Sequence, residues 1–207
     1  ESIVLNRFVE YLKSIHREWD VFDIEDVNER SPVVHLLPQI LKKQDMTVYA
    51  YQGNVCPQRA LPTSWGILFQ SLGPNARYNI RRKHKKLQER FRIDVEFFRS
   101  ETDDIREGVE AFMEIHGQRW KGVGHPSAFD DGKHRAFLCD FAKKFARRGW
   151  LRLFFLKVNN LRVATCFNFN YKNRIYMYQC NAYGPDEVMK CSPGMLIKGI
   201  AMRYGIN

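Results

Sequence analysis

The fold of this chain is decided by residues 186–197, which read Asp-Glu-Val-Met-Lys-Cys-Ser-Pro-Gly-Met-Leu-Ile. They follow an expected strand at residues 174–181 and open a helix expected to run from Pro193 to about residue 204. Ser192 suits the N-cap, because its hydroxyl can accept from a free backbone N–H. Proline is tolerated at the first helical position, and Gly194 leaves room for a ligand. The stretch therefore predicts an anion site at a helix N-terminus, with an ordinary well-capped helix as the alternative.

The composition indicates a globular protein of one large or two small domains. Hydrophobic residues make up 44% of the 207, which is ordinary for a chain that buries a core. No apolar run approaches the roughly 20 residues that cross a bilayer. The chain starts without a signal-peptide pattern and without Met, so we expect it to be cut from a longer protein. The net charge of +10 favours polyanionic partners without saying which.

The five cysteines are scattered, without a Cys-x-x-Cys pair or a histidine cluster beside them. This pattern is typical of reduced thiols in the cytoplasm rather than of a disulfide or zinc framework, so we expect no metal site.

The first 75 residues or so are expected to alternate between helices and short strands. Apolar periodicity predicts helices at residues 2–16, 32–43 and 65–72, the last capped by Thr63-Ser64. Alternation predicts strands at residues 19–24 and 47–51.

Residues 77–92 carry eight basic side chains and one acidic one, with apolar residues at helical spacing. They predict a basic amphipathic helix. A solvated helix face and a polyanion-binding surface are both compatible with it, and the surface would suit RNA or a peripheral contact with an anionic membrane.

The remainder predicts a mixed α+β arrangement. A strand at residues 93–98 is followed by a helix that starts with a capping box at Ser100 and Asp103, then by a helix at residues 129–148. Three strands follow at residues 150–158, 161–171 and 174–181. Two-residue turns, Asn159-Asn160 and Lys172-Asn173, favour an antiparallel meander.

This order, with the phosphate-type turn after the third strand of the meander, resembles the core of the GNAT acyltransferases. Local motifs resemble the bacterial group near cellulose- and exopolysaccharide-biosynthesis acetyltransferases, which is related to Fem-type peptidyltransferases. They are His116-x-x-Arg119-Trp120, Gly149-Trp150-Leu151-Arg152-Leu153, Arg162-Val163-Ala164 and Ser192-Pro193-Gly194-Met195-Leu196, with Cys56-Pro57, Leu61-Pro62-x-Ser64-Trp65 and Asn79-Ile80-Arg81-Arg82 upstream.

The resemblance implies tandem half-domains: a degenerate first half over residues 1–95, and a second half over residues 96–207 that binds acetyl-CoA or another acyl-CoA. The turn departs from the usual Gln/Arg-x-x-Gly-x-Gly/Ala of the family. Relatives also continue beyond the final helix with a further strand, so the second half is expected to be truncated here and impaired alone.

The resemblance also suggests roles for individual residues. Backbone N–H groups of Ser192, Gly194, Met195, Leu196 and Ile197, in the turn with Pro193, would hold the diphosphate. Gln179, Cys180 and Asn181 would lie beside the pantetheine, one N–H facing the thioester oxygen, unless they only pair within the sheet. Tyr183 could protonate the leaving thiolate or plug the strand end.

Three residues of the helix that starts at Ser100 and Asp103 are candidates for binding or activating the acceptor. His116 could act as the base, because its ordinary pKa lies near neutrality, or it could be a core histidine. Arg119 could bind an anionic acceptor or make a structural ion pair. Trp120 could stack on a sugar or pack in the core.

Three functions follow as hypotheses. The first is acyl-CoA-dependent transfer to an amine or hydroxyl of a saccharide or cell-envelope precursor. The second is Fem-type transfer from aminoacyl-tRNA, with residues 77–92 meeting the RNA. The third is a non-catalytic binding module that keeps the fold.

Overall fold

The computed structural model describes residues 2–25, 27–53 and 55–206. The chain divides into two compact units, Glu1–Arg59 and Ala60–Asn207, and each is described by itself.

The first unit is built on two helices, α1 (Ser2–Ser14) and α2 (Pro32–Lys42), with a short 3-10 turn η1 (His16–Glu18). The Ser31 hydroxyl caps α2 by accepting from Val33 N–H, as the Ser-Pro pair favours. Val9, Leu12 and Leu37 are buried between the two helices. Both helices therefore confirm the sequence prediction.

The strands predicted at residues 19–24 and 47–51 are wrong. Neither segment is a strand, and the described part of residues 2–59 contains none. The rings of Trp19 and Phe22 pack on each other with centroids 6.2 Å apart. In a strand, two residues three positions apart point to opposite faces, so their side chains could not meet in this way. Apolar and polar residues alternate in both segments, but neither segment pairs with a strand.

The second unit contains a four-stranded antiparallel sheet in the order β1-β2-β3-β4. The strands are β1 (Ile93–Phe98), β2 (Leu151–Val158), β3 (Leu161–Tyr171) and β4 (Arg174–Ala182). Both turns of the meander have positive φ at their two central residues, as tight hairpins require: 48° and 67° at Asn159 and Asn160, and 48° and 59° at Lys172 and Asn173. The predicted meander is confirmed, and β4 lies at one edge of the sheet.

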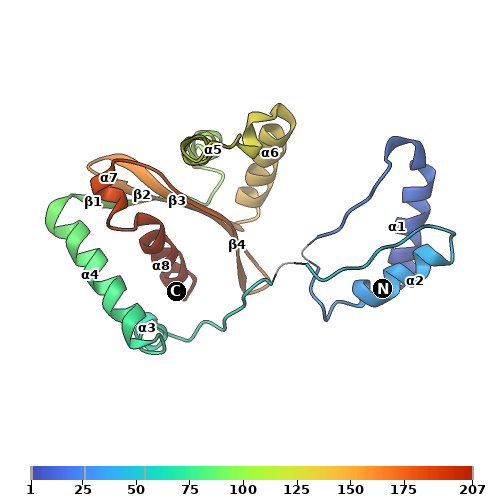
Figure 1. Cartoon of the computed structure of the whole chain (residues 1–207), viewed down its shortest axis with the longest axis horizontal. Helices are drawn as coiled ribbons and strands as arrows, with labels where there is room; N and C mark the ends of the chain where they lie inside the picture. Colours follow the sequence, from blue (N-terminus) through green and yellow to red (C-terminus); the bar gives the residue numbers. More distant parts are fainter. Residues whose placement is uncertain (1, 26, 54, 207) are drawn as a thin grey trace. The chain divides into compact units, whose positions relative to one another are not determined.

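Helices cover both faces of this sheet (Figure 1). One face carries α5 (Ile105–Gly122) and α6 (Gly132–Arg147), joined through the 3-10 turn η2 (Ala128–Asp130). Its core gathers Phe112, Leu138, Phe155 and Phe167. The other face carries α4 (Pro74–Arg90) and α8 (Pro193–Ile206), with the short α7 (Asp186–Met189) before α8. The mixed α+β layering is that of a GNAT-like fold.

The basic helix belongs to the second unit. Leu87 of α4 is completely buried in one core with Leu156 of β2 and Ile197 of α8. The preceding helix α3 (Trp65–Gln70) is capped by Ser64, as predicted. The compact units part at residue 59, and the division into GNAT-like halves over residues 1–95 and 96–207 stays a prediction.

The start of α5 differs from the predicted capping box. The N-cap is Asp104, whose carboxylate accepts from Glu107 N–H. Asp103 instead accepts from the N–H groups of Arg99 and Ser100, and these bonds lower the pKa of its carboxyl. Asp103 therefore stabilises the loop before α5, and Asp104 caps the helix.

Candidate functional site

The turn before α8 has a different local structure from the one predicted. Ser192 adopts a left-handed conformation with φ of 55°, and its backbone carbonyl, not its hydroxyl, accepts from Met195 N–H at 3.0 Å. The prediction that the Ser192 side chain caps the helix is therefore wrong. Pro193 does begin the helix, as predicted. Leu196 and Ile197 are buried in the core, and the N–H of Leu196 also donates to Ser192 O, at 3.4 Å.

Gly194 brings the helix start close to the end of β4. A methyl group in place of its hydrogen would lie 3.4 Å from Ala182 Cβ. Its N–H makes no hydrogen bond within the part of the chain that the structure describes. The first turn of α8 thus offers a free donor beside the last residue of the edge strand.

Lys83 reaches this turn from α4. Its Nζ donates to Ser192 Oγ, across 109 positions of sequence. Lys83 is half-buried and makes no ion pair with any described carboxylate. A second contact from α4 joins Arg90 to Glu187 of α7 at 3.6 Å. A cation without an acidic partner therefore stands beside the N-terminal end of α8, where an anion would be stabilised.

The edge strand β4 carries a bulge at Tyr178. Asn168 of β3 pairs with Met177 and Phe167 pairs with Gln179, so Tyr178 has no partner. Beyond the bulge, Tyr183 N–H donates to Val163 O at 3.0 Å. Because hydrogen bonds alternate along an antiparallel strand, the N–H groups of Cys180 and Ala182 point to the open edge.

Arg119 joins α5 to this edge. Its Nη1 donates to Asn181 Oδ1 at 3.1 Å and to Cys180 O at 3.3 Å. Three residues predicted separately from the sequence are thus brought together. The partners are a carbonyl and an amide, so the guanidinium keeps its charge uncompensated by any described carboxylate.

His116 lies one turn earlier and is almost completely buried. Its Nδ1 is 2.8 Å from Ser127 Oγ, and its ring packs on Phe129 with centroids 4.7 Å apart. Burial lowers the pKa of the imidazole, and the charge of Arg119 lowers it further, while Asp130 opposes both. His116 is therefore neutral near pH 7, but its described hydrogen bond leads to Ser127 rather than to β4.

Trp120 and Tyr183 are the two aromatic residues predicted for the site, one on α5 and one just after β4. The Trp120 ring lies beside His116, and the guanidinium carbon of Arg119 is 5.9 Å from its centroid. Tyr183 is exposed, and its ring edge lies 3.8 Å from the position a Cβ would take on Gly122. Tyr183 thus follows the edge strand and touches the last turn of α5.

Several polar atoms near Arg119 are buried without a partner. Thr165 Oγ1, Gln179 Oε1 and Asn181 Nδ2 have none among the described residues, and the same holds for Trp120 Nε1. Thr165 faces Asn181 across the two strands, with Gln179 two positions along the same face. Since buried polar atoms are nearly always paired, this layer has the donors and acceptors to bind hydroxyl, amine or amide groups of a ligand.

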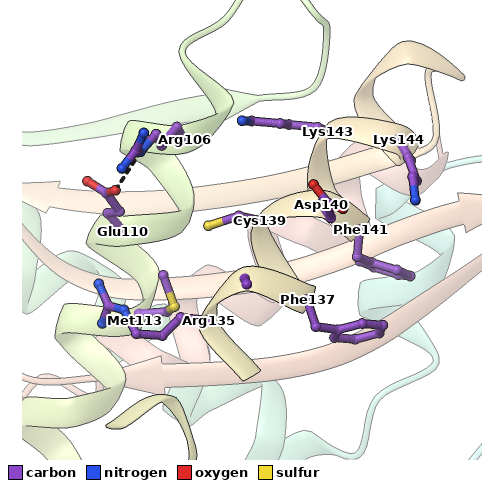
Figure 2. A pocket seen from close by; sticks show the side chains of 11 residues that line it. Arg106, Glu110, Met113, Arg135, Phe137, Cys139, Asp140, Phe141, Lys143 and Lys144 are labelled. Atoms are coloured by element: carbon purple, nitrogen blue, oxygen red, sulfur yellow. Dashed lines mark hydrogen bonds and ion pairs between the residues drawn. The ribbon is translucent and has the colours of Figure 1, made fainter. Parts of the chain in front are cut away.

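A groove of about 620 Å³ lies elsewhere, between α5 and α6 (Figure 2). Arg106 and Glu110 of α5 pair with each other on one side, and Phe137 and Phe141 of α6 lie on the other. None of the predicted site residues lines it.

Sequence reasoning missed Lys83 and Thr165. Lys83 stood within a run of basic residues that predicted a surface as a whole, and no local signal distinguishes the one side chain that turns to α8. Thr165 stands in a strand where threonine is ordinary.

Comparison with known families agrees with this geometry. Residues 74–206 match the acetyltransferase (GNAT) domain, beginning at the first residue of α4. The chain belongs to the GNAT acetyltransferase family and is an acyltransferase, whose domain implies acyl-CoA as co-substrate. No curated protein matches the chain.

None of the helices that the structure describes combines the length and apolarity needed to span a membrane. The described residues also contain no group of three or more His, Cys, Asp or Glu side chains able to hold a metal ion.

Proposed function

We propose that this chain transfers an acyl group from acyl-CoA, acetyl-CoA in the first instance, to an amine or hydroxyl of a saccharide or cell-envelope precursor in the cytoplasm. The family supports the co-substrate. The acceptor class is supported by the likeness of the sequence motifs to exopolysaccharide acetyltransferases, and by the polar layer of Thr165, Gln179 and Asn181.

The residues around the start of α8 fit the diphosphate of such a co-substrate. The proposal assigns the free N–H of Gly194 and the N-terminal end of the helix as donors, with Lys83 adding a full positive charge. Bound there, acyl-CoA supplies an acyl group activated as a thioester. The observation that carries the proposal is the contact between Gly194, in the turn that Lys83 reaches, and Ala182, at the end of the open edge strand β4.

The edge strand would then orient the reacting carbonyl. In the proposal, Cys180 N–H donates to the thioester oxygen, because this N–H points out of the sheet just after the bulge. As the acceptor forms its new bond to the acyl carbon, the carbon–sulfur bond breaks, and Tyr183 gives a proton to the departing sulfur.

The acceptor side is assigned to α5. His116, neutral near pH 7, would take the proton of the attacking amine or hydroxyl, directly or through Ser127. Arg119 would bind an anionic or carbonyl group of the acceptor, and Trp120 would pack against it.

The direct test is a transfer assay. The chain is incubated with acetyl-CoA and either amino sugars or neutral saccharides, with detection of free CoA thiol and of the acetylated product by mass spectrometry. We expect product with at least one saccharide class. Thiol release without saccharide product would place the acceptor elsewhere, and no thiol release with any acceptor would contradict the function.

The exposed face of α4 favours one alternative, transfer from aminoacyl-tRNA. Its basic residues Arg81, Arg82, Lys85, Lys86 and Arg90 are exposed, and of these Lys85 and Arg90 have acidic partners. Binding of tRNA that weakens steeply with salt, together with no affinity for acetyl-CoA, would favour this alternative. A contact of the same face with anionic membranes also stays a prediction.

A further inference from the structure

Two thiols face each other on β3 and β4. Cys166 pairs with Cys180 in the register of the sheet, and both are free thiols. Their side chains lie on the α8 face, where Cys166 is completely buried and Cys180 is partly exposed. Cys180 is therefore the member of the pair that a small reagent meets first.

The hydrogen-bonding pattern brings this pair unusually close. Tyr183 and Val163 form a hydrogen-bonded pair, so the alternation of the ladder makes Cys166 and Cys180, three positions away on each strand, a non-hydrogen-bonded pair. Residues opposed in this way have Cα atoms about 4.5 Å apart, against about 5.5 Å for their hydrogen-bonded neighbours. Disulfides span Cα separations of roughly 4.4–6.8 Å, so the pair lies at the short end of the permitted range.

We propose that Cys166 and Cys180 form a peroxide-oxidised dithiol site, in which Cys180 reacts first and Cys166 closes a reversible disulfide across the two strands. The Cys180 thiolate attacks one oxygen of the peroxide, the oxygen–oxygen bond breaks, and one water leaves after protonation. The Cys166 sulfur then attacks the resulting sulfenic acid and releases a second water. Two thiols are thereby oxidised by two electrons, and one peroxide is reduced.

The surroundings support this order of reaction. The Cys166 thiol donates to Asn168 Oδ1 at 3.2 Å. Interaction between the two neighbouring sulfurs raises the pKa of the Cys166 thiol and lowers that of the Cys180 thiol, while burial acts to raise the pKa of both. The positive charges of Lys198 and Arg119 also favour the Cys180 thiolate. The thiolate is the form that attacks peroxide, so the thiol that a reagent can reach, Cys180, is also the more reactive of the two. A disulfide that includes the partly exposed Cys180 sulfur is open to attack by a reducing thiol.

The test uses the whole 207-residue chain, hydrogen peroxide, and alkylation of the unfolded product. We expect two of the five cysteines to become resistant to alkylation, with a mass loss of two hydrogens. Digestion should give a linked peptide containing Cys166 and Cys180, and dithiothreitol should restore all thiols. Cys166→Ser should leave a sulfenic acid at Cys180 that dimedone traps, and Cys180→Ser should abolish both products.

The matched control is Cys139→Ser, because Cys139 is also partly exposed but lies on α6. This variant should form the same link as the unaltered chain. A link through another cysteine, five alkylatable thiols after peroxide, or irreversible oxidation of Cys180 in the unaltered chain would overturn the proposal. None of these readouts involves acyl-CoA, so they are independent of the proposed acyl transfer.

Discussion

Lys83 of α4 donates a hydrogen bond to Ser192, the residue immediately before α8. The contact puts a cation of the basic helix at the turn where the fold would bind a phosphate. It also gives α4 a second role besides its exposed basic face, and the two roles can be separated by substitution.

Lys83→Gln should weaken acetyl-CoA binding, measured by titration calorimetry. A lost charge-assisted contact to phosphate is worth roughly 1.5–3 kcal/mol, or about tenfold or more in Kd. The matched control is Lys85→Gln on the same helix, since Lys85 is exposed and pairs with Glu89 at 3.6 Å. Equal losses in both variants would mean that only the total charge of α4 matters.

Arg119→Gln should separate the two substrates. If the guanidinium binds the acceptor, the KM for the acceptor should rise about tenfold, while the Kd for acetyl-CoA changes little. Arg106→Gln, which removes an exposed arginine of the same helix paired with Glu110, is the control. Weaker acetyl-CoA binding with an unchanged acceptor KM would instead assign Arg119 to positioning β4.

His116 should make the fold sensitive to mild acid. Burial holds its pKa below the ordinary 6.5, so as pH falls below about 6.5 the unfolded chain takes up this proton before the folded chain does. The free energy of unfolding should therefore decrease as pH drops from 7 toward the folded pKa. Urea denaturation at several pH values should show a smaller acid-induced decrease in the unfolding free energy for His116→Gln than for the unaltered chain. If the unfolding free energy of both falls equally with pH, His116 is not the group responsible.

Gly108 and Gly117 give a paired test of the α5 packing. A Cβ at Gly108 would lie 2.8 Å from the Phe98 ring, so Gly108→Ala should destabilise by about 1–3 kcal/mol despite its better helix propensity. A Cβ at Gly117 would meet only Ser127 Cβ at 4.0 Å, so Gly117→Ala should stabilise by roughly 0.5–1 kcal/mol. Urea midpoints check both, and stabilisation by both would show that α5 is not packed as described.

Arg162 ties β3 to β1 and α5 through Glu96 at 2.5 Å and through Glu107. Both partners raise the pKa of the guanidinium, with the Glu96 hydrogen bond first. Arg162→Met leaves Glu96 partly buried and unpaired, so we expect a loss of about 1.5–3 kcal/mol of unfolding free energy. Replacing Arg106 of the exposed Arg106–Glu110 pair by Met should lower the unfolding free energy far less than Arg162→Met does.

The helices and strands of the second unit were predicted well because turn and capping residues next to them in the sequence determine where they begin and end. The meander follows from two Asn-containing turns whose residues do adopt positive φ, and Ser64 caps α3 as its sequence position suggests. The same rules failed at Trp19 and Phe22, where alternation without a partner strand gave no strand.

The site depends more on distant contacts. Arg119, Cys180 and Asn181 were each identifiable from the sequence, but their mutual contact depends on how α5 lies over β4. Lys83 could not be predicted, because only the packing of α4 against α8 selects it from its basic neighbours. Ser192 was predicted to cap through its side chain, and the left-handed backbone of the turn gives that role to its carbonyl instead.

Amide hydrogen exchange with and without acetyl-CoA tests the central claim most directly. We expect protection at residues 178–182, through the open-edge N–H groups of Cys180 and Ala182, and at residues 192–197, through the start of α8. Residues 2–18 should exchange unchanged. Acetyl-CoA that binds but protects other segments, or that fails to bind at millimolar concentration, would contradict the account, and the second result would favour a non-catalytic binding module.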